Sequence, residues 1–166
     1  MKVYIASDHA GFKLKNFLIN ELQNSSRSGD GGMSGYELIN SGPKEYDSSD
    51  DYPLTTQGAL KNVSADPASK GILICKNGVG VTIFANRFKN VRAGLSWTPE
   101  HAESHRHDDN TNVLTLPAEF ISKEKAVLIA RKWLETEFQE EERHKRRLKQ
   151  IEEFSLSQLR SQPQSQ

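Results

Sequence analysis

The chain has 166 residues, and its 22 lysines and arginines are balanced by 22 aspartates and glutamates, so its formal net charge is zero. This length is typical of one folded domain. The zero net charge excludes a general electrostatic attraction to nucleic acid or to an anionic membrane. A single cysteine, Cys75, rules out an intramolecular disulfide. Because neither a signal peptide nor a membrane-spanning stretch is expected, the sequence predicts a cytoplasmic protein.

Hydrophobic patterning predicts that strands and helices alternate along most of the chain. The expected strands are short β-prone or buried apolar runs, at residues 3–6, 36–39, 71–75, 91–95 and 112–116. The expected helices have apolar side chains at helical spacing or a helix-start signal, at residues 12–22, 53–63, 81–88 and 99–106. Alternation at this spacing predicts an α/β protein with a parallel sheet in three layers.

The C-terminal part is expected to be a long helix followed by a tail. The apolar stripe of this helix consists of Ala126, Ile129, Ala130, Trp133, Leu134 and Phe138. The charged run 140–147 is interpreted as its continuation, extended by the apolar residues at 148, 151 and 154. Polar composition predicts a mobile loop at residues 24–35 and disorder at 155–166. The expected organisation is one domain, residues 1–154, with a disordered polar tail at 155–166.

Two polar loops directly follow predicted strands, which is where ligands bind in parallel α/β sheets. The first contains Asp8 and His9, which could orient a hydroxyl and hold a phosphate, or could cap the following helix. The second follows Cys75 and contains Gly78 and Gly80, which allow backbone amides to approach an anion closely. The alternative for this second loop is a tight turn without a ligand.

Cys75 has a sequence context that favours a reactive thiol. A cysteine beside a glycine loop and a helix start often has a pKa below its usual value of about 8.5, and such a thiol can act as a base. The alternative is a small hydrophobic residue that closes the strand.

Two further clusters carry candidate ligands. Histidines 101, 105 and 107 could form a metal site, but no cysteine or carboxylate stands at ligand spacing, so surface histidines are the favoured interpretation. Arg143 and Arg147 are four residues apart and would share one helix face, where they could grip one phosphate. The alternatives for the arginines are a solvated basic face and a nucleic-acid contact.

Five motifs occur in a recognisable order. They are Ser-Asp-His-Ala-Gly-Phe-x-Leu-Lys at 7–15, Asp51-Tyr52-Pro53, Gly-Ile-Leu-Ile-Cys-x-x-Gly-Val-Gly-Val at 71–81 with Ala85-Asn86-Arg87, Asn112-Val113-Leu114, and Arg143-His144-x-x-Arg147. Each motif is weak singly, but in this order they resemble the type B ribose-5-phosphate isomerases. That family includes the galactose-6-phosphate isomerase subunits, and the resemblance covers about residues 1–151.

The resemblance implies an aldose–ketose isomerase with a Rossmann-like fold and a five-stranded parallel sheet. It also implies a homodimer with active sites at the subunit interface, and no metal or nucleotide cofactor. The expected reaction interconverts ribose 5-phosphate and ribulose 5-phosphate. Three alternatives stay open: isomerisation of a hexose 6-phosphate, sugar-phosphate binding without turnover, and nucleic-acid binding through residues 143–149. The zero net charge argues against the last of these.

By the same likeness, Cys75 is the expected base that moves a proton between C2 and C1 of the sugar through a cis-enediolate. The expected catalytic residues beside it are Asp8 and His107 for ring opening and Asn77 for the enediolate. The expected substrate-binding residues, which contact the oxyanion, the sugar or the phosphate, are His9, Tyr52, Gly78, Gly80, Asp109, Arg143 and Arg147.

The chain departs from the family pattern within the glycine loop. Relatives carry a hydroxyl residue where this chain has Asn77, so Asn77 would have to donate through its amide, while Lys76 adds positive charge. Some relatives use a glutamate base at the position of Val81, and the valine here favours the cysteine base.

Three further departures affect the expected ring-opening and phosphate contacts. One extra residue before Asn112 leaves His107 as the ring-opening candidate, whereas counting back without a gap places Asp108 there. Glu119 replaces a family arginine, which predicts one lost phosphate contact. The pair 141–142 places glutamates where relatives have glycines, which adds negative charge near Arg143.

Overall fold

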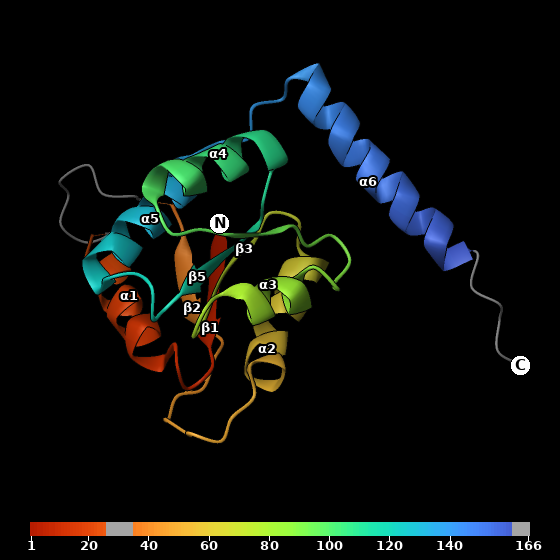
Figure 1. Ribbon diagram of the computed structural model, residues 1–166. Coiled ribbons are helices and arrows are strands. Elements are labelled where there is room, and N and C mark those ends of the chain that lie inside the picture. The colour runs from red at the N-terminus through yellow and green to blue at the C-terminus, as the bar shows by residue number, and fades with distance from the viewer. Residues whose placement is uncertain (26–34, 161–166) are drawn as a thin grey trace, which may run out of the picture.

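The computed structural model describes residues 1–25 and 35–160, and its central feature is one parallel sheet. The five strands lie in the order β2-β1-β3-β5-β4 (Figure 1). Their bounds are β1 Lys2–Ser7, β2 Glu37–Asn40, β3 Lys70–Cys75, β4 Ala93–Leu95 and β5 Val113–Pro117. The predicted α/β class and the five-stranded parallel sheet are confirmed.

Helices cover both faces of this sheet and make three layers. The bounds of the helices that pack on it are α1 Phe12–Ser25, α2 Tyr52–Ala65, α3 Val79–Ala85, α4 Pro99–Asp109 and α5 Lys123–Glu135. Helices α1, α4 and α5 share one hydrophobic core with strand residues such as Ile5 and Ile72. Helices α2 and α3 share the other core with Tyr4 and Leu73. Because neighbouring strand residues enter opposite cores, the strands are apolar on both faces.

The predicted single long helix is wrong, because the chain breaks into two helices after Glu135. Thr136 is in an extended conformation, and its hydroxyl donates to the carbonyl of Lys132 at 2.7 Å. The Gln139 amide then donates to the carbonyl of His107 at 3.0 Å, which ties this segment to the end of α4. These contacts redirect the backbone before helix α6 starts at Glu142.

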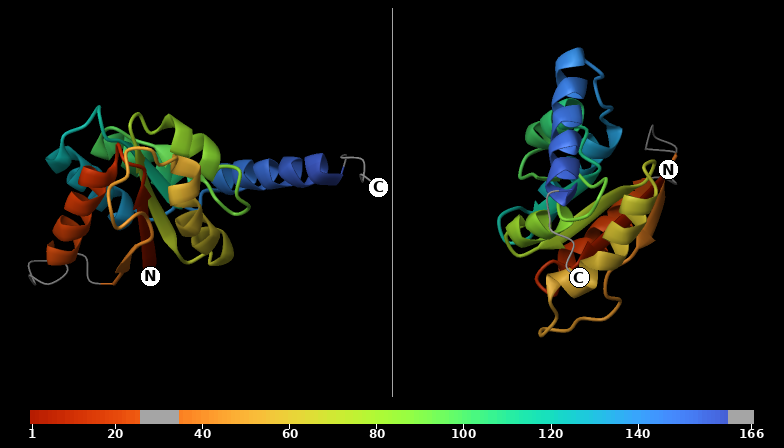
Figure 2. Two further views of the ribbon diagram at one scale, coloured as in Figure 1. Left: turned by 90° about the horizontal axis from the view of Figure 1, so that it is seen from below. Right: turned by 90° about the vertical axis from the view of Figure 1, so that its right-hand side faces the viewer.

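Helix α6 (Glu142–Arg160) projects away from the sheet, and only its first part lies near α4 (Figures 1 and 2). It continues to Arg160, whereas disorder was expected from residue 155. Residues 161–166, and residues 26–34 of the expected mobile loop, lie outside the described residues. None of the described helices has the length and apolar composition needed to cross a membrane.

Candidate active site

The loops after β1 and β3 meet at the carboxyl edge of the sheet. Ser7 pairs with Ile74 in the register of these strands, so the residues that follow each strand are neighbours. The Asp8 amide donates to the carbonyl of Ile74 at 3.3 Å. Gly11 lies so close to β3 that a Cβ atom there would be 2.6 Å from the Ile74 carbonyl oxygen. The first polar loop therefore lies directly against the strand end that carries Cys75.

The Cys75 thiol is held by the glycine loop. Its side chain is buried, and the Gly78 amide donates to Sγ at 3.2 Å. Gly78 has a φ of 76°, in the left-handed region that favours glycine, and a Cβ atom there would lie 2.4 Å from Leu95 Cδ1. An amide directed at sulfur stabilises the negative charge of a thiolate. The loop thus holds the sulfur atom at the strand end through a backbone hydrogen bond.

Asn77 is oriented by the same loop. Its Oδ1 accepts a hydrogen bond from the Val79 amide at 3.0 Å and lies 4.0 Å from Cys75 Sγ. Because the carbonyl group of this side chain is engaged by the backbone, its NH₂ group is the part that can donate elsewhere. Asn77 thus lies close to the thiol.

Lys76 and Glu119, two positions at which the chain departs from the family pattern, contact each other at the rim of the loop. Lys76 Nζ lies 3.3 Å from Glu119 Oε1, and the Glu119 amide donates to the carbonyl of Lys76 at 3.0 Å. Both side chains are exposed, so the pair adds little stability. Because the positive charge of Lys76 is paired with the negative charge of Glu119, the pair adds no net charge beside Cys75.

Asp8 is a buried carboxyl group in the loop after β1. Its Oδ1 accepts a hydrogen bond from the Gly11 amide at 2.9 Å. Burial raises the pKa of Asp8 above its ordinary value, and the Gly11 amide works against that shift. A carboxyl group in such surroundings is suited to exchanging a proton with a hydroxyl.

Tyr52, at the start of α2, packs over the glycine loop. A Cβ atom on Gly80 would be 2.8 Å from the Tyr52 ring, so only glycine allows this close approach. Tyr52 therefore lies against the loop that follows Cys75.

His9 is paired with Asp50, a residue that the sequence interpretation left without a role. The His9 Nδ1 atom lies 2.8 Å from Asp50 Oδ1, which also accepts a hydrogen bond from the His9 amide at 2.8 Å. The hydrogen bond with Asp50 raises the pKa of His9. Asp50 belongs to an acidic run that resembled an ordinary polar connection, so no local signal identified it.

A hollow of about 440 Å³ opens beside this pair, lined by His9, Ala10, Lys13 and Tyr46. Lys13 is in the first turn of α1, and it too was missed because it lies in a helix expected to serve packing. The sequence feature that could have identified Lys13 is its position four residues after His9, because this spacing places two basic side chains near the start of α1. The hollow can accept an anion.

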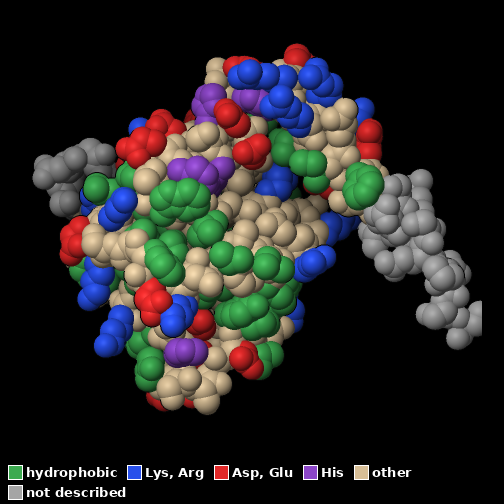
Figure 3. All heavy atoms as spheres, in the orientation of Figure 1, with side chains coloured by type: hydrophobic (Ala, Val, Ile, Leu, Met, Phe, Trp, Pro, Cys, Tyr) green, Lys and Arg blue, Asp and Glu red, His purple; other side chains and the backbone are tan. Residues whose placement is uncertain are grey.

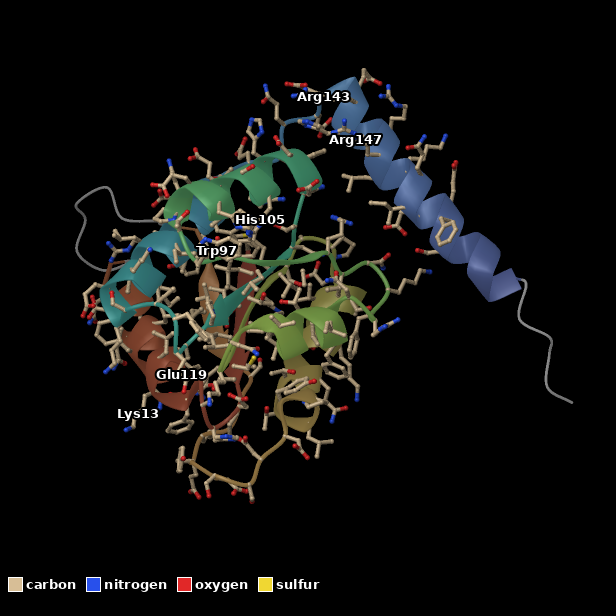
Figure 4. The ribbon with its side chains drawn as sticks, viewed as in Figure 1. Lys13, Trp97, His105, Glu119, Arg143 and Arg147 are labelled. Atoms are coloured by element: carbon tan, nitrogen blue, oxygen red, sulfur yellow. The ribbon has the colours of Figure 1, made fainter. Side chains whose placement is uncertain are left out.

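The remaining predicted site residues lie at the opposite edge of the sheet. His107 and Asp109 are at the end of α4, just before β5 begins at Val113, whereas Cys75 pairs with Pro117 at the other end of β5. Arg143 and Arg147 lie near the start of α6, far from Lys13 and Glu119 beside the first group (Figure 4). One chain therefore separates the predicted residues into two groups. The carboxyl-edge group is Asp8, His9, Tyr52, Cys75, Asn77, Gly78 and Gly80, and the α6 group is His107, Asp109, Arg143 and Arg147.

Within the α6 group, His107 contacts a carboxylate, Asp108. Its Oδ1 lies 2.5 Å from His107 Nδ1 and 3.9 Å from His144 Nε2, and the hydrogen bond with His107 lowers the pKa of Asp108. Arg143 Nε lies 2.7 Å from Glu141 Oε2, so the glutamate that replaces a family glycine binds the proposed phosphate residue. Basic side chains gather over the start of α6, with histidines and acidic side chains beside them (Figure 3).

The extra residue before Asn112 does not form a bulge that moves His107. Helix α4 is continuous to Asp109, and Asn110 ends it in the left-handed conformation with a φ of 49°. Asp109 is exposed, with no resolved contact to the histidines. His107 therefore remains on the helix, and Asp108 follows it in the last turn of α4.

His101 and His105 share a helix face, as their spacing predicts, but each Nδ1 contacts a hydroxyl group. His101 is 3.2 Å from Ser96 Oγ, and His105 is 2.7 Å from Thr111 Oγ1. Burial lowers the pKa of His105 to about 4. Within residues 1–25 and 35–160, no three histidine, cysteine or acidic side chains converge as metal ligands.

Comparison of the sequence with known proteins identifies the family to which the chain is similar. The family model described as ribose/galactose isomerase matches residues 3–151. Ribose-5-phosphate isomerase B of Mycolicibacterium paratuberculosis is 32% identical over 154 residues, which cover 93% of this chain and 91% of that protein.

Solved structures agree in fold over nearly the whole chain. Ribose-5-phosphate isomerase B from Mycoplasma genitalium with bound ribulose 5-phosphate superposes with a TM-score of 0.83, at 32% identity, over 93% of this chain and 95% of that chain. Type B ribose 5-phosphate isomerase from Trypanosoma cruzi gives a TM-score of 0.85 at 27% identity, over 95% and 97% of the two chains. The chain belongs to the ribose/galactose isomerase family.

Proposed function

We propose that the chain is an aldose–ketose isomerase that interconverts ribose 5-phosphate and ribulose 5-phosphate. The observation that carries this proposal is the buried Cys75 thiol, which accepts a hydrogen bond from the Gly78 amide at 3.2 Å, at the strand end against which the Asp8 loop lies. Family membership supports the reaction class, and the bound ribulose 5-phosphate in the Mycoplasma genitalium relative supports the substrate.

In the proposed mechanism, the Cys75 thiolate removes the proton from C2 of the opened aldose. The electrons of the C2–H bond form the C1–C2 double bond of a cis-enediolate, and the carbonyl electrons move to O1. Amides of the Gly78–Gly80 loop stabilise that oxyanion, and the Asn77 amide group supports it. The thiol then returns the proton to C1, while the proton of the C2 hydroxyl passes to the O1 oxyanion and the C2–O bond becomes a carbonyl. Atoms and charge balance without an added cofactor.

The hollow beside His9 is the proposed place for the phosphate on this side of the site. His9 carries positive charge more readily because Asp50 is hydrogen-bonded to it, and Lys13 adds a second basic group. A remote phosphate contact of this kind fixes the sugar so that a modest base can act on it. Glu119 cannot supply a further contact, since it is negative and paired with Lys76.

The two separated groups of residues support a homodimer with composite sites. The carboxyl-edge group holds the base but no arginine, and the α6 group holds the arginines on a helix that projects from its own sheet. Beyond the arginines, α6 exposes the apolar side chains of Ile151 and Phe154, which a second copy would cover. In the proposed dimer, Arg143, Arg147, His107 and Asp109 of one copy complete the Cys75 site of the other.

The experiment that tests the function measures conversion of ribose 5-phosphate by purified wild-type protein and by Cys75→Ala. Loss of the base predicts a fall in kcat of roughly 10²- to 10⁴-fold. Lys61→Ala, an exposed change on α2, is the matched control and should keep wild-type turnover. A Cys75→Ala protein within a few-fold of wild type would contradict the cysteine base, and a folded wild type without turnover would contradict the isomerase.

The Lys76–Glu119 pair favours testing one alternative substrate class. This pair changes the charge and shape of the rim next to Cys75, where a longer sugar would extend. Parallel measurement with galactose and allose 6-phosphates separates the two classes, because a hexose enzyme would show the higher kcat/KM on those substrates. Saturable binding of either sugar phosphate without conversion would instead indicate a binding protein.

A further inference from the structure

One carboxylate in the structure lies between two imidazole rings. Asp108 Oδ1 is 2.5 Å from His107 Nδ1 and 3.9 Å from His144 Nε2. The two rings are 6.3 Å apart at 71°. His107 comes from the end of α4 and His144 from the first turn of α6, so the contact joins the two helices.

Of the two rings that face Asp108, His144 is buried and His107 is partly exposed. His144 is only 2% exposed, and its Nδ1 contacts the Gln139 carbonyl at 3.3 Å. The Gln139 amide donates to the carbonyl of His107, which closes the connection between the segments. The His107 side chain is 39% exposed, so of the two rings only His107 can reach a substrate.

We propose that Asp108 is a positioning residue for His107 in ring opening, an inference that rests on the proposed function. With its Nδ1–H bound to Asp108, His107 keeps Nε2 free for the substrate. His144 and Arg143 face the same carboxylate from α6, and both favour its ionised form.

The proton transfer balances within the composite site. The C1–O4 bond of the ribofuranose breaks, and its electrons pass to O4, which takes the proton from His107 Nε2 of one copy. The hydroxyl on C1 gives its proton to the Asp8 carboxylate of the other copy and becomes the aldehyde. Cys75 then acts on the opened sugar.

A comparison of two substrates tests this role, because only one of them needs ring opening. Ribose 5-phosphate is mainly a furanose, whereas ribulose 5-phosphate cannot close a five-membered ring, since its O5 carries the phosphate. For Asp108→Ala we expect kcat on ribose 5-phosphate to fall roughly 10- to 100-fold. Exchange of the C1 proton of ribulose 5-phosphate with deuterated water should stay within about threefold of wild type, because this exchange needs the Cys75 step but no ring closure.

Asp108→Asn tests the hydrogen bond itself. Its amide oxygen can still accept from His107 Nδ1–H, so on ribose 5-phosphate we expect a smaller loss of kcat than for Asp108→Ala. Glu103→Gln, also on α4 and paired with Lys132 rather than with the histidines, is the matched control and should match wild type.

Each of four outcomes would overturn the inference. An equal loss in turnover of ribose 5-phosphate and in C1 exchange would mean that Asp108 only supports the fold, and no loss in either would mean that it does not position His107. An Asp108→Asn protein that is no more active than Asp108→Ala would show that the hydrogen bond to His107 has no role. A wild type that turns over neither substrate would overturn the proposed function itself, and with it this role.

Discussion

Among single residues, His105 links the fold to pH. It is 8% exposed, its Nδ1 contacts Thr111 Oγ1 at 2.7 Å, and the same hydroxyl accepts from Trp133 Nε1 at 3.0 Å. Its Nε2 is buried without a hydrogen-bond partner. Since burial lowers the pKa of His105 to about 4, the folded chain holds this ring neutral where the unfolded chain already binds a proton.

This residue therefore predicts a loss of stability in acid. The stabilisation is complete above the unfolded pKa of about 6.5 and declines as the pH falls from there towards 4, where the loss reaches roughly 3 kcal/mol. Urea unfolding at pH 7.5, 5.5 and 4.5 measures it. We expect His105→Gln to flatten this dependence, and His101→Gln, a change at the exposed neighbour on the same helix, to preserve it. Equal slopes for wild type and His105→Gln would contradict the assignment.

Local motifs predicted the residues of the carboxyl edge, because the chain places them beside one another in short loops. Cys75, Asn77 and Gly78 contact each other within four residues of sequence. Asp50 could not be predicted this way, since it reaches His9 from 41 residues away and depends on how two loops meet. His144 was quoted only as part of a motif, and its burial against Asp108 depends on the turn before α6.

Among the elements, the contact of α1 with β3 depends on a glycine. A Cβ atom on Gly11 would meet the Ile74 carbonyl oxygen at 2.6 Å, and this atom belongs to the backbone and cannot rotate away. The same turn carries Asp8, so the spacing between helix and strand also sets the position of a catalytic candidate.

We expect Gly11→Ala to lower the free energy of unfolding by about 1–3 kcal/mol, because the helix must move away from the strand. Gly58→Ala is the contrasting control. Gly58 is exposed within α2, and its nearest neighbour would be the Ser41 carbonyl oxygen at 3.9 Å, so alanine should raise stability by about 0.5–1 kcal/mol. Urea midpoints of both variants measure these opposite effects. A Gly11→Ala protein as stable as wild type would show that the turn tolerates the shift.

The elements were predicted well where apolar periodicity was strong, and less well where tertiary contacts decided. All five strands were predicted, with shifts at their ends. The break after Glu135 was missed, because residues 136–141 have no proline or glycine and their charged composition suits a helix. It is the backbone contact of Gln139 with His107 that ends the first helix.

For the whole molecule, the division of the site residues is the main finding. The carboxyl-edge group, which contains Cys75, and the α6 group, which contains Arg143, lie at opposite edges of one sheet. Sequence order contains no sign of this division, because both groups belong to the same motif series. Only the direction of β5, with His107 before it and the Cys75 partner Pro117 at its end, separates them.

Mixing two inactive variants tests the composite site. Cys75→Ser removes the base, and Arg147→Ala removes a contact from the other group. If each site takes one group from each copy, half of the re-associated dimers are mixed and have one intact site, so about a quarter of wild-type activity should return. Two variants of the same group, Cys75→Ser and Asp8→Asn, should restore nothing. Failure of the first mixture despite subunit exchange would place each site within one chain.

The projection of helix α6 has a consequence for how the protein responds to dilution. In the proposed dimer, each chain supplies its arginines to its neighbour, so a chain that is alone has no complete site and leaves Ile151 and Phe154 exposed. Association then governs activity and folding stability together through mass action. Specific activity and the unfolding temperature should therefore both rise with the amount of protein in the tube, so that values from different preparations are comparable only at equal concentration.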